Sequence, residues 1–290
     1  MTVADRLAPA LRHLAGARIS LAPEDLAAVR SSLDQRRADA VVDTTGVDIS
    51  ENRAIGVRVY RVPDAAGAVI YCHSGAFVLG NLDTDHRQCV ELARRAGVAV
   101  YSVDYRLSPE NPCPAALDDA LSVLRWAAES GGPLAIAGSS AGAALAARAA
   151  QLSATGEAPP VVFQLLHQPV LDDRPTPSKR EFTDTPGVDA AAVAQMWTYY
   201  LAGAQASADS APGRAEDLSG LCPALITCSE LDPLRDEALD YGERLRRAGV
   251  AAEVRLYPGT CHGFDSMAPD WEVSRQLWAL QASALREALG

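Results

Sequence analysis

The chain has 290 residues, of which 48% are apolar and 22% are charged, and its formal net charge is -11. This composition is typical of a globular protein with a sizeable core, and it excludes disordered, collagen-like and coiled-coil chains. The negative charge would repel the phosphate backbone of nucleic acid, so we expect no nucleic-acid partner.

No apolar run reaches about 18 residues, so we expect no membrane span. Residues 1–20 lack the basic and apolar pattern of an export signal, which predicts a cytoplasmic protein. The six cysteines stand singly, without a C-x-x-C pair. This spacing predicts reduced, mostly buried thiols and neither a disulfide framework nor a zinc site.

The first part of the chain is predicted to be helical. Apolar residues recur at helical spacing in two stretches, namely Leu7, Leu11 and Leu14, and then Leu26, Val29 and Leu33. Pro23 suits the first position of the second helix, which we expect over residues 23–37. Periodicity alone does not decide whether these side chains form core or pocket wall, and core is the default expectation.

From about residue 41 the pattern changes to short β-branched runs, which predict seven or eight strands. The predicted strands are 54–62, 68–72, 98–103, 133–137, 161–166, 224–228 and 252–257. Helical patterns such as 87–96 and 114–128 lie between them, and this alternation predicts an α/β fold with a mostly parallel sheet flanked by helices.

Two regions depart from this regular alternation. Residues 171–218 are rich in Pro, Asp, Ser and Ala around one helical segment near 190–201, so an insertion there is placed to cover a site. The run 252–257 is predicted as an exposed edge strand, which favours pairing between two copies of the chain. The residues alone leave the oligomeric state open between a monomer and a homodimer.

The most informative segment is G-S-S-A-G at 138–142, because an apolar strand precedes it and an Ala-rich helix, predicted over 143–150, follows it. G-x-S-x-G between a strand and a helix holds a serine on a strained turn, with the helix N-terminus favouring negative charge. Ser140 is the predicted nucleophile. The alternative is a serine that merely caps the helix.

A serine nucleophile needs a base, and His262 is the best of five histidines because it lies in a Gly-flanked loop directly after a predicted strand. Asp232 follows the preceding strand, which gives the chain order Ser, Asp, His of α/β-hydrolases. Asp232 is also well placed to cap a helix, and Asp236 is the alternative acid. Cys261 adjoins the histidine, but we favour a buried structural thiol.

The strand 68–72 ends in the small-residue turn H-S-G-A-F at 73–77, whose backbone amides are placed to face the serine together with the amide of Ala141. Such donors stabilise the anionic tetrahedral intermediate of acyl transfer. His73 is interpreted as a residue that fixes this turn and not as the base.

These elements together resemble the hormone-sensitive-lipase-like, or bacterial family IV, carboxylesterases of the α/β-hydrolase superfamily. The resemblance rests on H-S-G-A-F at 73–77, G-S-S-A-G at 138–142, D-P-L-R-D-E at 232–237 and H-G-F at 262–264, and it extends over Y-R-L-S-P-E at 105–110. It implies oxyanion donors at Gly75, Ala76 and Ala141. We expect a structural role for 105–110, in which Arg106 and Glu110 pair and brace the oxyanion loop; the alternative is a solvent-facing pair that contributes little to stability.

The resemblance also implies an α/β-hydrolase domain over 41–290 and a helical cap formed by residues 1–40 and an inserted segment at about 171–218. It predicts a serine esterase for small esters with short to medium acyl chains, without metal or organic cofactor. The side chains expected at the substrate pocket are Phe77, Ser139, Met196, Trp197 and Phe264.

Two departures from the family pattern keep other functions open. Ser74 and Ala76 stand where the family has glycines, and Ser139 and Ala143 stand where G-D-S-A-G-G has Asp and Gly. The altered oxyanion motif motivates a dehydratase, lyase or cyclase of secondary metabolism as the alternative. A non-catalytic small-molecule receptor is disfavoured because His262 is present.

Overall fold

A computed structural model describes residues 2–290, and its eight strands form one sheet. The strands are β1 (Asp48–Asn52), β2 (Val57–Arg61), β3 (Ala68–Cys72), β4 (Ala99–Val103), β5 (Leu134–Ser139), β6 (Phe163–His167), β7 (Ala224–Leu231) and β8 (Ala252–Cys261). Their order is β1-β2-β4-β3-β5-β6-β7-β8. β2 pairs antiparallel with β1 and β4, and the other neighbours pair in parallel. The predicted α/β fold is confirmed.

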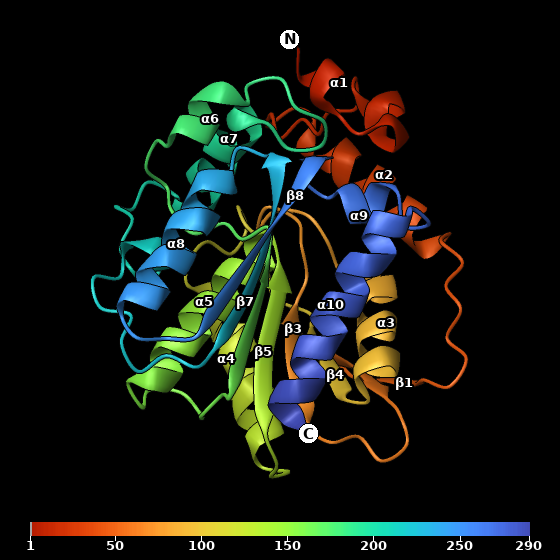
Figure 1. Cartoon of the computed structure of the whole chain (residues 1–290), viewed down its shortest axis with the longest axis vertical. Coiled ribbons are helices and arrows are strands. Elements are labelled where there is room, and N and C mark those ends of the chain that lie inside the picture. Colours follow the sequence, from red (N-terminus) through yellow and green to blue (C-terminus); the bar gives the residue numbers. More distant parts are fainter. Residues whose placement is uncertain (1) are drawn as a thin grey trace.

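Helices cover both faces of this sheet and its carboxyl end. They are α1 (Val3–Arg6), the 3₁₀ helix η1 (Pro9–Leu14), α2 (Leu26–Ala38), α3 (His86–Ala96), α4 (Ala115–Ala128), α5 (Ala141–Ala154), α6 (Pro177–Glu181), α7 (Ala190–Leu201), the 3₁₀ helix η2 (Pro212–Arg214), α8 (Arg235–Arg247), α9 (Phe264–Met267) and α10 (Glu272–Leu289). Figure 1 shows α3 and α10 on one face, and α4, α5 and α8 on the other.

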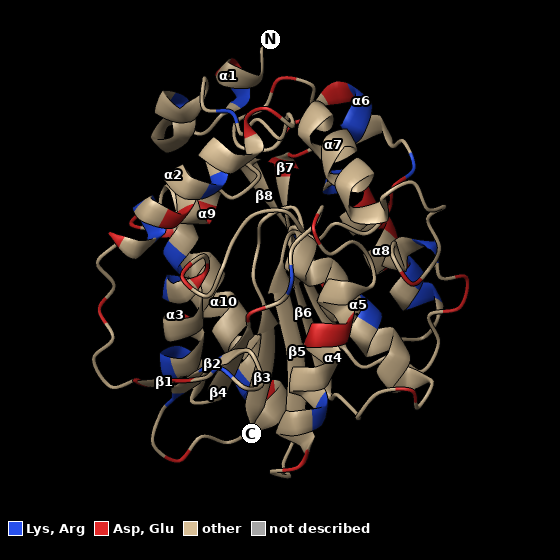
Figure 2. Cartoon of the chain, turned by 180° about the vertical axis from the view of Figure 1, so that it is seen from behind, with Lys and Arg blue, Asp and Glu red and all other residues tan. Residues whose placement is uncertain are grey.

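The central strands are buried on both faces because both faces are covered by helices. In β3, Ala68, Ile70 and Cys72 pack in the cluster that includes α4, α5 and α8, whereas Val69 and Tyr71 pack with α3 and α10. This alternation explains why the strand reads as a continuous apolar run. Figure 2 shows acidic and basic residues interspersed along the outer helices, while the strands are mostly uncharged.

The two segments predicted as a cap lie together at the carboxyl end of the sheet (Figure 1). The amide of Ile19 donates to the carbonyl of Gly187 at 3.0 Å, and the amide of Gly187 donates to the carbonyl of Ala17 at 2.9 Å. These bonds join the N-terminal segment to the insertion. Leu7, Leu11 and Leu26 are core residues, as expected by default, whereas Leu33 is only partly buried and lines a cavity.

The structure corrects several predicted boundaries. The run 54–62 contains only one strand of a hairpin, because the chain turns between β1 and β2 at Gly56, whose φ of 71° is left-handed. The helix expected around Leu7 to Leu14 is divided into α1 and η1, since Pro9 begins the second element. Strands β7 and β8 extend beyond their predicted ends at 228 and 257. Among residues 2–290, no helix is long and apolar enough to cross a membrane.

Candidate active site

Ser140 lies on the tight turn between β5 and α5, with a φ of 55° and a ψ of -117°. A non-glycine residue rarely adopts a positive φ, and the surrounding packing holds it there. A Cβ on Gly138 would overlap the backbone of Gly142, and a Cβ on Gly142 would overlap the carbonyl of Cys72. The amide of Ser140 donates to the carbonyl of His167 at 2.8 Å. The turn therefore needs both glycines.

Asp232 and His262 meet because β7 and β8 remain paired to their ends. Leu231 pairs with Cys261 after a register shift in the ladder, and the next residue of each strand is the acid or the histidine. The longer ladder is thus what assembles this half of the site.

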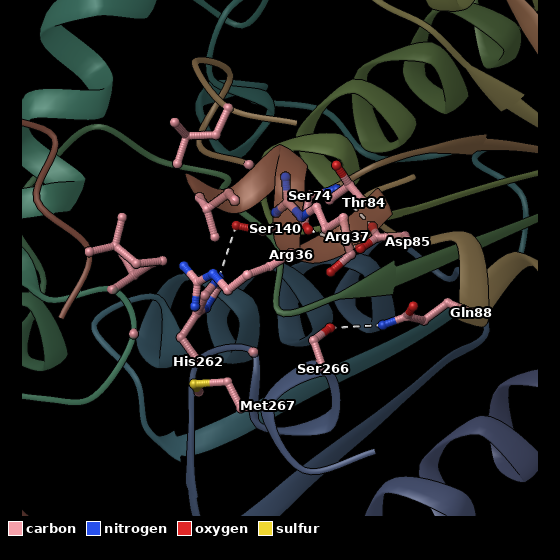
Figure 3. Close-up of a pocket in the computed structure, with 18 of the residues that line it drawn as sticks. Arg36, Arg37, Ser74, Thr84, Asp85, Gln88, Ser140, His262, Ser266 and Met267 are labelled. Atoms are coloured by element: carbon pink, nitrogen blue, oxygen red, sulfur yellow. Dashed lines mark hydrogen bonds between the residues drawn. The ribbon is translucent and has the colours of Figure 1, made fainter. Parts of the chain in front are cut away.

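The three predicted catalytic side chains form a continuous hydrogen-bonded chain. His262 Nε2 lies 2.9 Å from Ser140 Oγ, and His262 Nδ1 lies 2.8 Å from Asp232 Oδ2. The other carboxylate oxygen, Asp232 Oδ1, accepts from the amide of Leu234 at 2.8 Å. All three side chains are buried. Figure 3 shows His262 directed at Ser140.

The charge of Asp232 sets the basicity of His262. Burial lowers the pKa of His262, but the Asp232 carboxylate raises it through its charge and its hydrogen bond, and the net pKa lies above the ordinary value. A histidine with a raised pKa is a stronger base towards the serine hydroxyl. The arrangement suits proton transfer from Ser140.

The alternative acid and the neighbouring thiol are placed for structural roles. Asp236 Oδ2 accepts from the amide of Ser178 at 2.7 Å, and Asp236 Oδ1 accepts from Arg235 at 2.8 Å. Asp236 thereby connects α8 to α6, and the hydrogen bond to His262 is made by Asp232. Cys261 is buried, and burial raises the pKa of its thiol to about 12, so the reactive thiolate is disfavoured at neutral pH.

The turn after β3 presents the predicted oxyanion donors. Gly75 has a φ of 137°, and Ala76 has a φ of 54° although it is not glycine. A Cβ on Gly75 would overlap the carbonyl of Leu79. Within residues 2–290, the amides of Gly75, Ala76 and Ala141 donate to no backbone oxygen. They are therefore available to an anion that develops beside Ser140.

Asp85 fixes this turn, and no local sequence pattern marks that role. Its Oδ2 accepts from the Ser74 amide at 2.8 Å and the Tyr71 hydroxyl at 3.1 Å, and its Oδ1 accepts from the Ser74 hydroxyl at 3.0 Å. The serine that replaces a family glycine thus has a bonded hydroxyl. His73 stacks on Tyr105, and burial lowers the pKa of His73 to about 4, which fits the predicted turn-fixing role.

The predicted Arg106–Glu110 pair is wrong. Arg106 Nε lies 2.9 Å from Asp119, and Glu110 pairs at 2.6 Å with Arg30 of α2. Arg30 Nε also donates to the carbonyl of Val78 in the oxyanion turn at 2.7 Å. The cation that braces the oxyanion turn is therefore Arg30 of the N-terminal segment. Local sequence patterns do not reveal such long-range contacts.

Gln168 holds the histidine loop, and it too escapes sequence reasoning. Its side-chain Oε1 accepts from the amide of Gly263 at 2.7 Å, and its Nε2 donates to Ser229 Oγ at 2.6 Å. Gln168 follows β6 with a positive φ of 46°. It links the residue after His262 to β7.

A cavity of about 560 Å³ opens beside the hydrogen-bonded chain. Ser140, His262, Gly75 and Ala76 line it, together with Ser139 of the predicted pocket residues. The other four predicted pocket residues are buried in the core and do not line this cavity: Phe77, Met196, Trp197 and Phe264. Phe77, for example, stacks on Tyr200 at 3.7 Å. Apolar character alone did not distinguish core from pocket wall.

The donors around the cavity suit acyl-transfer chemistry. Within residues 2–290, no group of three or more His, Cys, Asp or Glu side chains is placed to hold a metal ion. The chemistry available at the site is that of a hydroxyl, an imidazole, a carboxylate and backbone amides. These are the parts of a serine hydrolase.

Comparisons with known proteins agree with this geometry. The profile of a family described as alpha/beta hydrolase fold matches residues 69–266. The chain is 44% identical over 226 residues to esterase LipI of Mycobacterium tuberculosis, covering 72% of this chain and 71% of LipI. It is 40% identical over 252 residues to carboxylesterase NlhH of the same species, covering 81% and 79%.

Solved structures give the same result. Esterase LipW from Mycobacterium marinum aligns with a TM-score of 0.93 and 53% identity over 98% of this chain and 96% of LipW. A bacterial heroin esterase aligns with a TM-score of 0.91 and 33% identity over the full length of both chains. The chain therefore belongs to the α/β-hydrolase fold family. Within that family, its motifs and relatives place it among the hormone-sensitive-lipase-like carboxylesterases, as the sequence predicts.

Proposed function

We propose that this chain is a serine carboxylester hydrolase that acts through an acyl-enzyme. The observation that carries the proposal is the hydrogen-bonded chain Ser140–His262–Asp232 at the wall of a cavity, beside three available backbone amides. The esterase names of the relatives support the same reaction class.

In the acylation step, His262 Nε2 takes the proton of Ser140 as Oγ forms a bond to the ester carbonyl carbon. The amides of Gly75, Ala76 and Ala141 hold the carbonyl oxygen, which becomes negative. His262 then gives its proton to the departing alcohol as the ester C–O bond breaks. Asp232 keeps the imidazole in the tautomer with the proton on Nδ1.

In the deacylation step, His262 removes a proton from water, and the resulting hydroxide equivalent attacks the acyl carbon. The same amides hold the second oxyanion. The carboxylic acid leaves as His262 returns the proton to Ser140 Oγ. The cycle consumes one water and restores the enzyme without a cofactor.

The proposed substrates are small esters with short to medium acyl chains. A cavity of about 560 Å³ is of the size that holds small molecules, whose pockets range over about 300–1,000 Å³. The test is hydrolysis of p-nitrophenyl acetate, butyrate, octanoate and palmitate by the native protein beside Ser140→Ala. We expect turnover that favours the short esters and depends on Ser140. Equal turnover by the variant would refute the proposal.

The cap, the location and the assembly also stay proposals. We propose that residues 1–40 and 171–218 act as a cap, that the protein is cytoplasmic, and that two copies pair through β8, which lies at the edge of the sheet. Light scattering at working concentration tests the pairing. A monomer at every concentration would remove the dimer.

A further inference from the structure

Two consecutive arginines of α2 lie on the wall of the proposed active-site cavity. Arg36 and Arg37 line the same cavity as Ser140 and His262, and Figure 3 draws all four around it. Arg36 also lines a second cavity of about 260 Å³, which shares part of its wall with the first. Two positive groups therefore share a cavity with the reacting atoms in a chain whose net charge is -11.

Arg37 is charged, largely buried and poorly paired. Its side chain is 20% exposed, and its Nη1 has no hydrogen-bond acceptor among residues 2–290. The nearest carboxylate is Asp34 at 3.9 Å, which is beyond hydrogen-bonding distance. Burial lowers the pKa of Arg37 although the charges of Asp85 and Asp34 act to raise it, so the carboxylates compensate its charge only in part. An acceptor supplied by a ligand would satisfy this guanidinium.

The acidic residues of the cavity are already occupied. Asp83 pairs with Arg58 at 2.6 Å, and Asp85 accepts hydrogen bonds from Ser74 and Tyr71. A third arginine of the cavity wall, Arg87, donates to a backbone carbonyl. Arg36 donates from Nε to the carbonyl of Ser32 at 3.3 Å, so Arg37, with its unpartnered Nη1, is the least engaged charge of the cavity wall among residues 2–290.

We propose that Arg37, assisted by Arg36, binds a carboxylate of the substrate, so that the preferred substrates are esters carrying a carboxylate on their acyl or alcohol part. A guanidinium presents parallel N–H donors that match the two oxygens of a carboxylate. The inference rests on the proposed ester hydrolysis and names its substrate class. Because the chain as a whole repels anions, the subsite acts through direct contact and not through long-range attraction.

The test compares matched neutral and anionic esters in the full-length enzyme. For the acyl part, p-nitrophenyl butyrate is paired with mono-p-nitrophenyl glutarate. For the alcohol part, phenyl butyrate is paired with 4-carboxyphenyl butyrate. The measured quantity is the ratio of kcat/KM for the anionic ester to kcat/KM for its neutral partner. This ratio does not depend on the concentration of active enzyme in each preparation.

Arg37→Gln is expected to lower this ratio by about 10- to 100-fold for one of the two pairs, the effect of losing a charged hydrogen bond. Arg37→Lys should lose less, since it keeps the positive charge. The matched control is Arg53→Gln, which makes the same charge change at a side chain 92% exposed in the turn between β1 and β2. The control should leave the ratio unaltered.

A second measurement uses the native enzyme and does not depend on the folding of a variant. Glutarate should inhibit hydrolysis of p-nitrophenyl butyrate competitively, and 1,5-pentanediol at the same concentration should inhibit far less. An unaltered ratio in Arg37→Gln, an equal fall in Arg53→Gln, or equal inhibition by the acid and the diol would overturn the subsite. Absence of all ester hydrolysis by the native enzyme would instead refute the proposed function.

Discussion

The replacement Asp232→Asn tests how the site holds its histidine. In the native structure, Asp232 Oδ1 accepts from the amide of Leu234 at 2.8 Å, while Oδ2 faces His262 Nδ1 at 2.8 Å. An asparagine must direct its oxygen at the Leu234 amide, because two donors would otherwise face each other. Its NH₂ group then faces His262 Nδ1, which can only accept.

The proton of the neutral imidazole therefore moves to Nε2, the atom 2.9 Å from Ser140 Oγ. That nitrogen can no longer take the serine proton. In a serine protease, the same change in tautomer lowers kcat by about 10⁴, or about 5.4 kcal/mol of transition-state stabilisation. We expect a loss of that size in kcat for p-nitrophenyl butyrate, with KM changed much less.

The assay is steady-state hydrolysis, with circular dichroism to check that each variant folds. Asp236→Asn is the matched control, because Asp236 is an acid of the same segment that bonds to Ser178 and Arg235 and not to the histidine. It should keep kcat within about threefold, since no acyl-transfer contact is lost. The reasoning fails if Asp232→Asn keeps more than a tenth of kcat, or if the control loses as much.

Three further predictions test the histidine base, the turn that carries Ser140 and a buried ion pair. Because the pKa of His262 is raised and its neutral form is the base, kcat/KM should rise with pH through an apparent pKa above 6.5 and be lost below it; a pH profile centred below 6.5 would contradict this. In Gly142→Ala the added Cβ would overlap the carbonyl of Cys72 at the end of β3, so kcat should fall about 100-fold. The control is Gly16→Ala, whose added Cβ meets open space, and it should retain activity. In the native protein the Lys179 ammonium lies 2.5 Å from the buried Glu237 carboxylate. Lys179→Met leaves that carboxylate without its partner and should lower the free energy of unfolding by about 3 kcal/mol. An unchanged urea midpoint would count against this prediction.

The parts of the site that follow from short-range rules were predictable from the sequence. Ser140 is recognised because the glycines on either side, the strand before and the helix after all belong to one local turn. The chain order of Asp232 and His262 identified candidates, but their meeting depends on the paired ends of β7 and β8. The fold class followed from the alternation of buried strands and amphipathic helices.

The remaining features depend on contacts between distant segments. Arg30 braces the oxyanion turn across 48 residues of sequence through its bond to Val78, and no periodicity marks such a contact. Asp85 and Gln168 act through bonds to a turn and a loop whose geometry exists only in the folded chain. The same limit explains why Phe77 and Trp197 were expected at the pocket, since apolar residues of core and pocket wall look alike in sequence.

The central claim is that Ser140 Oγ becomes acylated. Its most direct test is mass spectrometry of the protein after reaction with diethyl p-nitrophenyl phosphate, in which the serine oxygen displaces p-nitrophenolate and keeps the diethyl phosphoryl group. We predict one adduct per chain, located on the peptide that contains Ser140, with loss of esterase activity in proportion to labelling and no adduct in Ser140→Ala. Labelling of another residue in step with inactivation, or an enzyme that stays active after Ser140 is fully labelled, would contradict the account.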